Sequence, residues 1–161
     1  MTVDTLTEFG LAEMDEAEID RFLYNQSVGV LGLPAEGAPY LLPLTFGYDG
    51  EEGRLYFTFF VGDASRKVAL SRRADRAGFL VYKADSAFVW ESVLLTGTID
   101  ELPPDAWTAH EDVLSNAWRL DVFERAATAG DLRTFEFDVL DRRGLRYAEL
   151  PPGFAPRDAD G

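Results

Sequence analysis

The stretch from Arg54 to Lys67 constrains the fold more than any other part of this chain. It opens with Leu55–Val61, seven consecutive aromatic, aliphatic or threonine residues, a composition typical of a β-strand covered on both faces. A Gly-Asp pair ends this run, and the residues that follow fit a helix that Asp63 or Ser65 can cap. The sequence therefore predicts a strand that leads through a short turn into the start of a helix.

Ser65, Arg66 and Lys67 occupy the predicted N-terminus of that helix. Free backbone N–H groups and the helix dipole favour an anion at such a position. An arginine beside a lysine adds positive charge with two different hydrogen-bonding geometries. Two interpretations stay open, a phosphate site or basic side chains that are simply solvated. Lysine is rare in this chain, with only Lys67 and Lys83 against thirteen arginines, so each lysine calls for an explanation.

The composition indicates an acidic protein with a hydrophobic core. A chain of 161 residues is long enough for one domain. Acidic residues outnumber lysine plus arginine by 29 to 15, which gives a net charge of −14 and argues against binding to nucleic acid or an anionic membrane. Hydrophobic residues make up 47 %, which excludes an acidic disordered tail. An acidic, lysine-poor chain is typical of a halophilic cytoplasm, where salt screens self-repulsion.

Several kinds of site are missing from the sequence. Without cysteine there is no disulfide, thiolate nucleophile or cysteine metal site. The single histidine, His110, is better explained as a solvated or hydrogen-bonded side chain than as a catalytic base, and it cannot form a metal site alone. The N-terminal residues lack the features of a signal peptide, and no apolar run can span a bilayer. We therefore expect a cytoplasmic protein without a metal, and we assign no catalytic residue.

The rest of the chain predicts about six strands and three helices. Strands are expected at Val28–Leu33, Tyr40–Tyr48, Leu55–Val61, Ala77–Tyr82, Ala87–Ile99 and Thr134–Val139, with Leu145–Leu150 as an extension, and helices at 16–26, Ser65–Ala74 and from Pro103 to about Leu120. Because strands follow strands in near-sequential order, a mainly β fold, an antiparallel barrel with accessory helices, is favoured over a doubly wound sheet. We expect the domain to span residues 15–150, between a flexible N-terminus (1–14) and a tail (151–161).

Pro43 stands in the middle of the second predicted strand. It cannot donate a hydrogen bond to a ladder, so the strand must be open or bulged there. An ordinary edge strand and a bulge that faces a ligand both explain it. Gly29 and Gly32 in the first strand leave room for a neighbouring backbone or a ligand, or mark a bulge.

Several short motifs follow one another in a distinctive order. Tyr56-Phe57-Thr58 precedes Ser65-Arg66-Lys67, the Pro43–Phe46 segment lies before both, and Trp90–Gly97 lies after them. In this order they resemble the pyridoxamine 5′-phosphate oxidase-like family of FMN-binding split-barrel proteins. The resemblance runs from about Ile19 to Ile99 and more loosely to Val139. It implies an antiparallel split β-barrel that binds FMN at the interface of a homodimer.

The resemblance also implies roles for individual residues. Arg66 and Lys67, helped by Ser65, would hold the FMN phosphate. The ring system and ribityl chain would run along Pro43, Leu44, Thr45, Phe46, Thr58 and Phe59. Ser92 and Trp90 would come from the partner subunit. A flavin needs an apolar slot, a few polar groups and a cationic anchor, and these residues offer all three.

The implied activity is an FMN-dependent oxidoreductase that acts on a small molecule, with NADH or NADPH as a candidate electron donor. The Arg-Leu-x-Pro pattern of the true oxidase is absent from Asp141–Tyr147, so vitamin B6 oxidation is not assigned. Asp63 also puts a negative charge near the proposed phosphate. The alternative is a non-catalytic binding or sensor module that uses flavin, deazaflavin or haem on the same barrel. Haem is disfavoured because His110 is the only candidate imidazole ligand.

Overall fold

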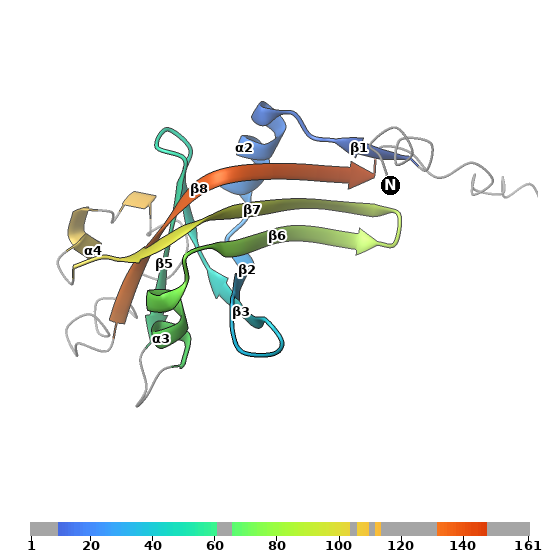
Figure 1. Ribbon diagram of the computed structural model, residues 1–161. Coiled ribbons are helices and arrows are strands. Elements are labelled where there is room, and N and C mark those ends of the chain that lie inside the picture. The colour runs from blue at the N-terminus through green and yellow to red at the C-terminus, as the bar shows by residue number, and fades with distance from the viewer. Residues whose placement is uncertain (1–9, 61–65, 104–105, 110–111, 114–131, 148–161) are drawn as a thin grey trace, which may run out of the picture.

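A computed structural model describes residues 10–60, 66–103, 106–109, 112–113 and 132–147 (Figure 1). Its strands are β1 (Leu11–Glu13), β2 (Val28–Leu33), β3 (Tyr40–Thr45), β4 (Gly47–Asp49), β5 (Arg54–Phe60), β6 (Ala77–Ser86), β7 (Val89–Glu101) and β8 (Leu132–Tyr147). Its helices are α2 (Glu16–Asn25), α3 (Arg66–Arg73) and α4 (Ala106–Ala109). The expected tail, Ser65, Asp63, His110 and most of the third predicted helix lie outside the described residues.

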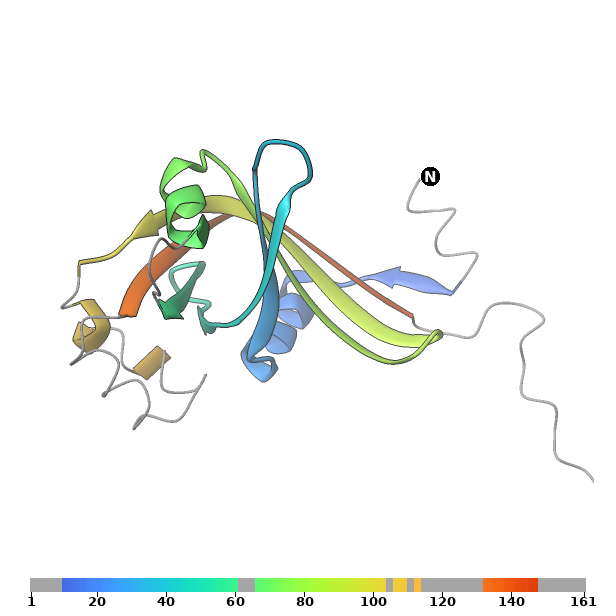
Figure 2. The ribbon, with the colours of Figure 1, turned by 90° about the horizontal axis from the view of Figure 1, so that it is seen from below.

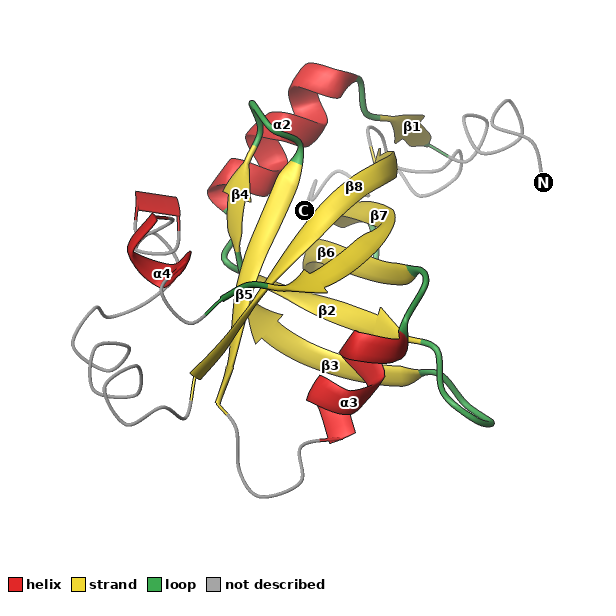
Figure 3. Ribbon diagram, turned by 60° about the vertical axis from the view of Figure 1, so that its left-hand side comes forward, coloured by secondary structure: helices red, strands yellow, loops and turns green. Residues whose placement is uncertain are grey.

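All the described strands form one antiparallel sheet in the order β3-β2-β6-β7-β8-β5-β4, with β1 paired to β8. The sheet curls into a split β-barrel, as Figure 3 shows, so the predicted antiparallel barrel is confirmed. The near-sequential hairpins that we expected are present, but they do not continue from β5 to β6. Hairpins join β2 to β3, β4 to β5 and β6 to β7, but β6 pairs with β2 and β5 pairs with β8.

The structure contains more strands than the sequence predicted, for two local reasons. The predicted strand Tyr40–Tyr48 is divided at Phe46, whose buried side chain turns the backbone from the β2 ladder to the β5 ladder. Its ring packs edge-on against Phe79 at 5.3 Å. In addition, Leu11–Glu13 pairs with β8 as strand β1, although the sequence placed these residues in a flexible N-terminal segment.

Helix α2 begins where the sequence predicts. The Asp15 side chain accepts a hydrogen bond from the Glu18 backbone N–H, and the Glu18 side chain accepts one from the Asp15 N–H, both at 2.8 Å. This capping box satisfies two donors that a helix start leaves free. The helix buries Ile19, Phe22 and Leu23, which fixes it against one end of the barrel (Figure 1).

The core fills the inside of the barrel with aromatic rings. Phe57 lies between Phe79 and Phe135, with ring centroids 5.8 and 6.3 Å away, and all three are fully buried. A side chain at Gly29 would collide with the Phe79 ring. The space that this glycine leaves is therefore used by a core side chain.

Pro43 lies on an edge strand. Strand β3 ends the sheet and pairs in an unbroken register with β2, with Pro43 opposite Val30. An edge position tolerates proline because no neighbouring strand needs its N–H. Of the two explanations for Pro43, the structure has the edge strand, and the β2–β3 pairing contains no bulge.

Strands β6, β7 and β8 run well beyond the barrel, as Figures 1 and 2 show. Because paired residues share a face of a sheet, the register separates two faces of this sheet. The inner face carries buried residues such as Phe79 and Leu95. The outer face is apolar yet exposed, and its large exposed side chains are Val28, Leu41, Tyr82 and Leu94.

Candidate functional site

The start of α3 brings two cations against two aromatic rings. The Arg66 guanidinium lies 5.1 Å from the centroid of the Tyr40 ring on β3, and the Lys67 ammonium lies 5.3 Å from the centroid of the Phe59 ring on β5. A cation over an aromatic face is attracted by the negative face of the ring. We call these four residues the α3 corner. The sequence placed Arg66 and Lys67 at a helix start, and the structure confirms that α3 begins at Arg66.

The α3 corner differs from the other cationic positions in its partners. Within the part of the chain that the structure describes, neither Arg66 nor Lys67 forms an ion pair with a carboxylate. On the same helix, Arg72 donates two hydrogen bonds to Glu101, at 2.6 and 3.0 Å. The arginines that form ion pairs with carboxylates are Arg54, Arg72, Arg133, Arg142, Arg143 and Arg146. Among the described residues, therefore, no carboxylate neutralises the two positive charges of the α3 corner.

Beside this corner the barrel is open. Strands β3 and β5 lie next to each other in space. Among the described strands, however, β3 pairs only with β2, and residues 57–60 of β5 pair only with β8. We call the gap between these edges the split. Backbone N–H and C=O groups at an unpaired edge can accept a ligand in place of a strand. Figure 3 shows α3 beside β3 at this side of the barrel.

The predicted ring-slot residues divide between the core and the split. Phe46 and Phe59 have buried side chains, and Leu44 packs partly against the core. Thr45 and Thr58 are half-buried on the two edge strands. Pro43 is exposed on the outer face, where it lines a hollow of about 380 Å³ with Val28, Val30 and Tyr82. Contacts from Phe46 to a ligand in the split are therefore limited to its backbone.

Trp90 and Ser92 lie far from the α3 corner within one chain. Both are near the start of β7, whereas Glu101, the partner of Arg72 in α3, ends that strand. At about 3.3 Å per residue, Trp90 and Glu101 are roughly 35 Å apart along the strand. Trp90 packs against Tyr147 with a centroid distance of 5.1 Å. The structure does not join Trp90 and Ser92 to the α3 corner of the same subunit.

Comparison with known proteins now identifies the family. The family model described as pyridoxamine 5′-phosphate oxidase matches residues 15–139, more than half of the chain. The chain belongs to the pyridoxamine 5′-phosphate oxidase family. The resemblance inferred from its motifs is thereby confirmed. No curated protein matches the sequence.

Solved structures share the fold of this family member. A FAD-binding protein from Mesorhizobium loti is 21 % identical, with a TM-score of 0.67 over 86 % of this chain and 98 % of the other. The FAD and heme binding protein from Mycobacterium smegmatis is 18 % identical, with a TM-score of 0.66 over 91 % and 77 %. A putative 5-nitroimidazole antibiotic resistance protein from Bacteroides thetaiotaomicron is 17 % identical, with a TM-score of 0.65 over 84 % and 86 %. At these identities the likeness shows the fold alone.

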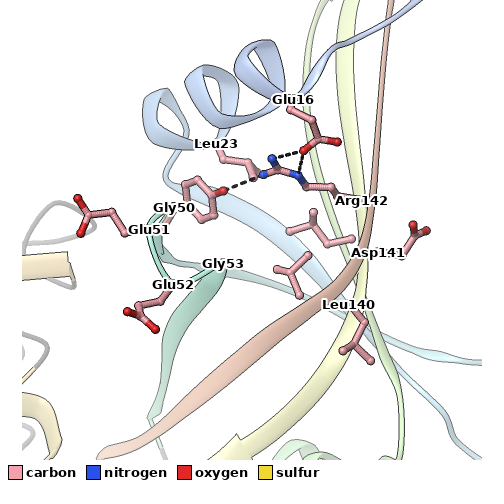
Figure 4. A pocket seen from close by; sticks show the side chains of 12 residues that line it. Glu16, Leu23, Gly50, Glu51, Glu52, Gly53, Leu140, Asp141 and Arg142 are labelled. Atoms are coloured by element: carbon pink, nitrogen blue, oxygen red, sulfur yellow. Dashed lines mark hydrogen bonds and ion pairs between the residues drawn. The ribbon is translucent and has the colours of Figure 1, made fainter.

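The structure contains a second charged cluster, which the sequence did not predict. Arg142 of β8 reaches under α2 toward Glu16, as Figure 4 shows, and donates to Asp20 at 2.7 Å and to the Tyr48 hydroxyl at 3.0 Å. The Tyr48 hydroxyl donates to Asp20 at 2.6 Å. We call these four residues the Arg142 clasp. It borders a hollow of about 480 Å³ between α2, the β4–β5 hairpin and β8.

The contacts of the Arg142 clasp shift the pKa values of Asp20 and Tyr48. Burial would raise the pKa of the Asp20 carboxyl, but hydrogen bonds from Tyr48 and Arg142 and the charge of the arginine outweigh burial and lower this pKa below its ordinary value. Burial and the neighbouring Asp20 carboxylate raise the pKa of the Tyr48 hydroxyl. Both shifts favour a charged Asp20 that is held by a neutral tyrosine and a charged arginine.

Arg143 and Arg146, which follow Arg142 in β8, also form ion pairs. Arg143 lies 3.5 Å from Glu13, and Arg146 lies 2.9 Å from Glu18. The segment that lacks the Arg-Leu-x-Pro pattern of the true oxidase therefore uses its arginines to hold β1 and α2 to the sheet. A sequence cannot reveal these pairs because the partners lie more than a hundred positions apart.

Two further features are absent from the described residues. No group of three or more histidine, cysteine, aspartate or glutamate side chains there is arranged to hold a metal ion. No helix among them has the length and apolar character of a bilayer crossing.

Proposed function

We propose that this chain binds FMN in the split between β3 and β5 and acts as an FMN-dependent oxidoreductase on a small molecule. The observation that carries the proposal is the α3 corner. Two cations rest there on aromatic rings, without a carboxylate partner among the described residues, in a chain with a net charge of −14. A phosphate is the kind of anion that an arginine and a lysine at a helix start can bind.

The residues around the split fit the rest of a flavin. Open strand edges supply backbone hydrogen-bonding groups, and Leu44, Thr45 and Thr58 supply short or apolar side chains, while Pro43 lies on the outer face of the same edge strand. When bound, a flavin supplies the redox chemistry, while the protein supplies binding and orientation. The names of the Mesorhizobium loti and Mycobacterium smegmatis structures, which are FAD-binding proteins, support a flavin as the class of cofactor. The choice of FMN rests on the phosphate anchor and the sequence motifs.

A homodimer is part of the proposal. The outer face of the sheet exposes Val28, Leu41, Tyr82 and Leu94, and more than half of each side chain is exposed. Such a continuous apolar face on a folded chain is typical of an interaction surface. Ser92 and Trp90 belong to the same face by register. A second copy of the chain on this face would bring its Trp90 and Ser92 close to a flavin that the first copy binds.

The alternative function is a module that binds a flavin, deazaflavin or haem without turnover. The α3 corner favours it, because its four residues include no carboxylate and no imidazole, the commonest general acids and bases of enzymes. A flavoprotein needs no such group for simple electron transfer, since the cofactor carries that chemistry. The two functions therefore differ in what happens after the cofactor is bound.

The first experiment measures cofactor binding. The protein is purified in high salt, its absorption spectrum is recorded, and FMN, FAD, riboflavin and haem are titrated into the cofactor-free form. Preference for FMN supports the proposal, and FMN that NADH or NADPH then reduces supports the oxidoreductase. A bound flavin that no donor reduces favours the binding module. Failure to bind FMN rejects the proposal.

The second experiment tests the dimer. Leu94→Arg puts a charge on the outer face, and Leu140→Arg puts the same charge on a similarly exposed leucine beside the α2 hollow. We expect Leu94→Arg to give monomers with weakened FMN binding and Leu140→Arg to behave like the wild type, as measured by light scattering and FMN titration. Dimers in the Leu94→Arg variant would contradict an interface on this face.

A further inference from the structure

We propose that Tyr40 is a positioning residue for the phosphate anchor, because its ring holds the Arg66 guanidinium in place without neutralising it. The inference rests on the proposed function and adds a residue to that site. Tyr40 lies at the start of β3, opposite Leu33 in the β2 ladder. In the sequence it is separated from Arg66 by the rest of β3, by β4 and β5, and by the segment that joins β5 to α3. Its ring and the guanidinium meet at 5.1 Å.

Core packing and strand pairing fix the position of the Tyr40 ring. It is half-buried and packs against the core, and strand pairing holds its backbone. The equivalent ring under Lys67 belongs to Phe59, which is buried and packs against Phe135 at 5.0 Å. Side chains held by packing give a binding site its geometry before the ligand arrives. The two rings therefore restrict where the two cations can lie.

An aromatic partner has an effect that a carboxylate partner cannot have. A carboxylate competes with the incoming phosphate for the same N–H donors, as Glu101 occupies those of Arg72. A ring attracts the cation through its face and leaves the N–H groups at the edge of the guanidinium free to donate. Because this chain has 29 acidic residues, a mobile Arg66 would have many carboxylates to reach. The ring keeps it at the corner.

Two substitutions of Tyr40 separate the effect of its ring from the effect of its hydroxyl. Tyr40→Phe keeps the ring, and Tyr40→Leu keeps an apolar side chain but removes the ring. We expect Tyr40→Phe to bind FMN like the wild type and Tyr40→Leu to bind it roughly two- to five-fold more weakly, the size of a partly exposed cation–π contact. Riboflavin, which lacks the phosphate, serves as the second probe, and its affinity should be the same in all three proteins.

Two controls make the assignment specific. Arg72→Ala removes an arginine from the same helix whose charge Glu101 already neutralises, and we expect it to leave the ratio of FMN to riboflavin affinity unchanged. In an Arg66→Ala background, Tyr40→Leu should cause no further loss of FMN affinity, because the two residues act as one unit. Flavin fluorescence or calorimetry measures each dissociation constant, and the urea midpoint shows that each variant is folded.

Each contrary result has its own meaning. A Tyr40→Leu variant that loses FMN and riboflavin equally, or that loses FMN again in the Arg66→Ala background, overturns the positioning role. If the wild type prefers FMN to riboflavin and Tyr40→Leu keeps this preference in full, the positioning role of Tyr40 is wrong but the phosphate anchor stands. A wild type that binds FMN no better than riboflavin overturns the phosphate anchor itself, and with it this inference.

Discussion

The α3 corner and the Arg142 clasp are both built around arginine, but they use its charge in opposite ways. At the clasp, Arg142 is largely buried, with 23 % of its side chain exposed, and meets two carboxylates and a hydroxyl. At the corner, Arg66 lies on a ring and Lys67 on another, and no described carboxylate pairs with either. The cation of the clasp is used by the fold, whereas no carboxylate of the described residues neutralises the two cations of the corner.

This difference shows that partners tell more about the role of a cation than its place in the sequence. The sequence alone leaves Arg66 open between a phosphate ligand and a solvated charge and assigns no role to Arg142, whereas the structure gives each a defined partner. A half-buried arginine that is shared by several partners is costly to remove, because Asp20, Glu16 and Tyr48 all lose a donor at once. A cation held only by a ring contributes little to folding and can be removed at small cost to stability.

The largest expected effect comes from breaking the clasp. We expect Arg142→Ala to lower the free energy of unfolding by about 2–3 kcal/mol, because Asp20, Glu16 and Tyr48 lose a shared donor and the two carboxylates then repel each other. FMN affinity at a temperature where the variant is folded should stay at the wild-type value. Urea unfolding and FMN titration measure the two quantities.

Arg73→Ala is the matched control for the clasp, since Arg73 is an exposed arginine of α3. Its free energy of unfolding should lie within about 0.5 kcal/mol of the wild type. If Arg142→Ala weakened FMN binding at unchanged stability, the clasp would belong to the site, and the contrast between the two clusters would be wrong.

The second effect comes from breaking the corner. We expect Lys67→Ala to weaken FMN binding by more than about ten-fold, because it removes a charge-assisted contact to the phosphate. The free energy of unfolding should change by less than about 0.5 kcal/mol. Lys83→Ala, which removes the other lysine of the chain from an exposed position on β6, should leave FMN affinity unchanged. Equal FMN affinity in both lysine variants would contradict the anchor.

Much of the fold could be predicted because it depends on neighbouring residues. Alternation in Val93–Thr96 predicts two faces, and the structure buries Val93 and Leu95 while it exposes Leu94 and Thr96. The capping box at Asp15 predicts the start of α2 to the residue. The break at Phe46 and the pairing of β6 with β2 could not be predicted, because both are decided by contacts between distant strands.

The residues of the candidate site also divide into those that local sequence predicts and those that depend on contacts between distant strands. Arg66 and Lys67 stood out because a strand, a turn and a helix start are local features. Tyr40 did not stand out as part of the site, since its ring meets Arg66 only after the barrel has closed around the core. The Arg142 clasp was hidden for the same reason, because its members come from α2, β4 and β8. The physics of each contact is simple, but its existence depends on the topology.

A smaller effect tests whether the clasp acts as one network. Tyr48→Phe removes a hydroxyl that donates to Asp20 and accepts from Arg142. We expect a loss of about 1 kcal/mol in the free energy of unfolding, the typical contribution of a hydrogen bond to a charged group after partial exposure is considered. In the Arg142→Ala background the same change should cost less, because the hydroxyl has lost one of its partners. Strictly additive losses would contradict the network.

The smallest effect concerns the pH dependence of the clasp, measured as the stability gap between the wild type and Asp20→Asn. The pKa of Asp20 is lowered in the folded protein from an ordinary value of 3.8. Below that value the unfolded chain binds a proton that the folded chain still refuses, so the contribution of Asp20 is complete above pH 3.8 and is lost as the pH falls through the lower, folded pKa. Asp20 is 38 % exposed, and water screens it, so we expect a gap of less than about 1 kcal/mol.

The comparison with Asp20→Asn isolates one group among many, because the other carboxylates titrate in both proteins and largely cancel from the gap. We expect the gap to be constant between pH 5 and 7, as set by the lowered pKa of Asp20, and to shrink below pH 3.8. In the Arg142→Ala background the gap should change much less with pH, because the arginine supplies a hydrogen bond and a charge that lower this pKa. A gap that widened in acid would mean that burial outweighs the arginine at Asp20. The clasp would then hold a strained carboxylate, and its arginine would be closer in character to the two cations of the α3 corner than its contacts indicate.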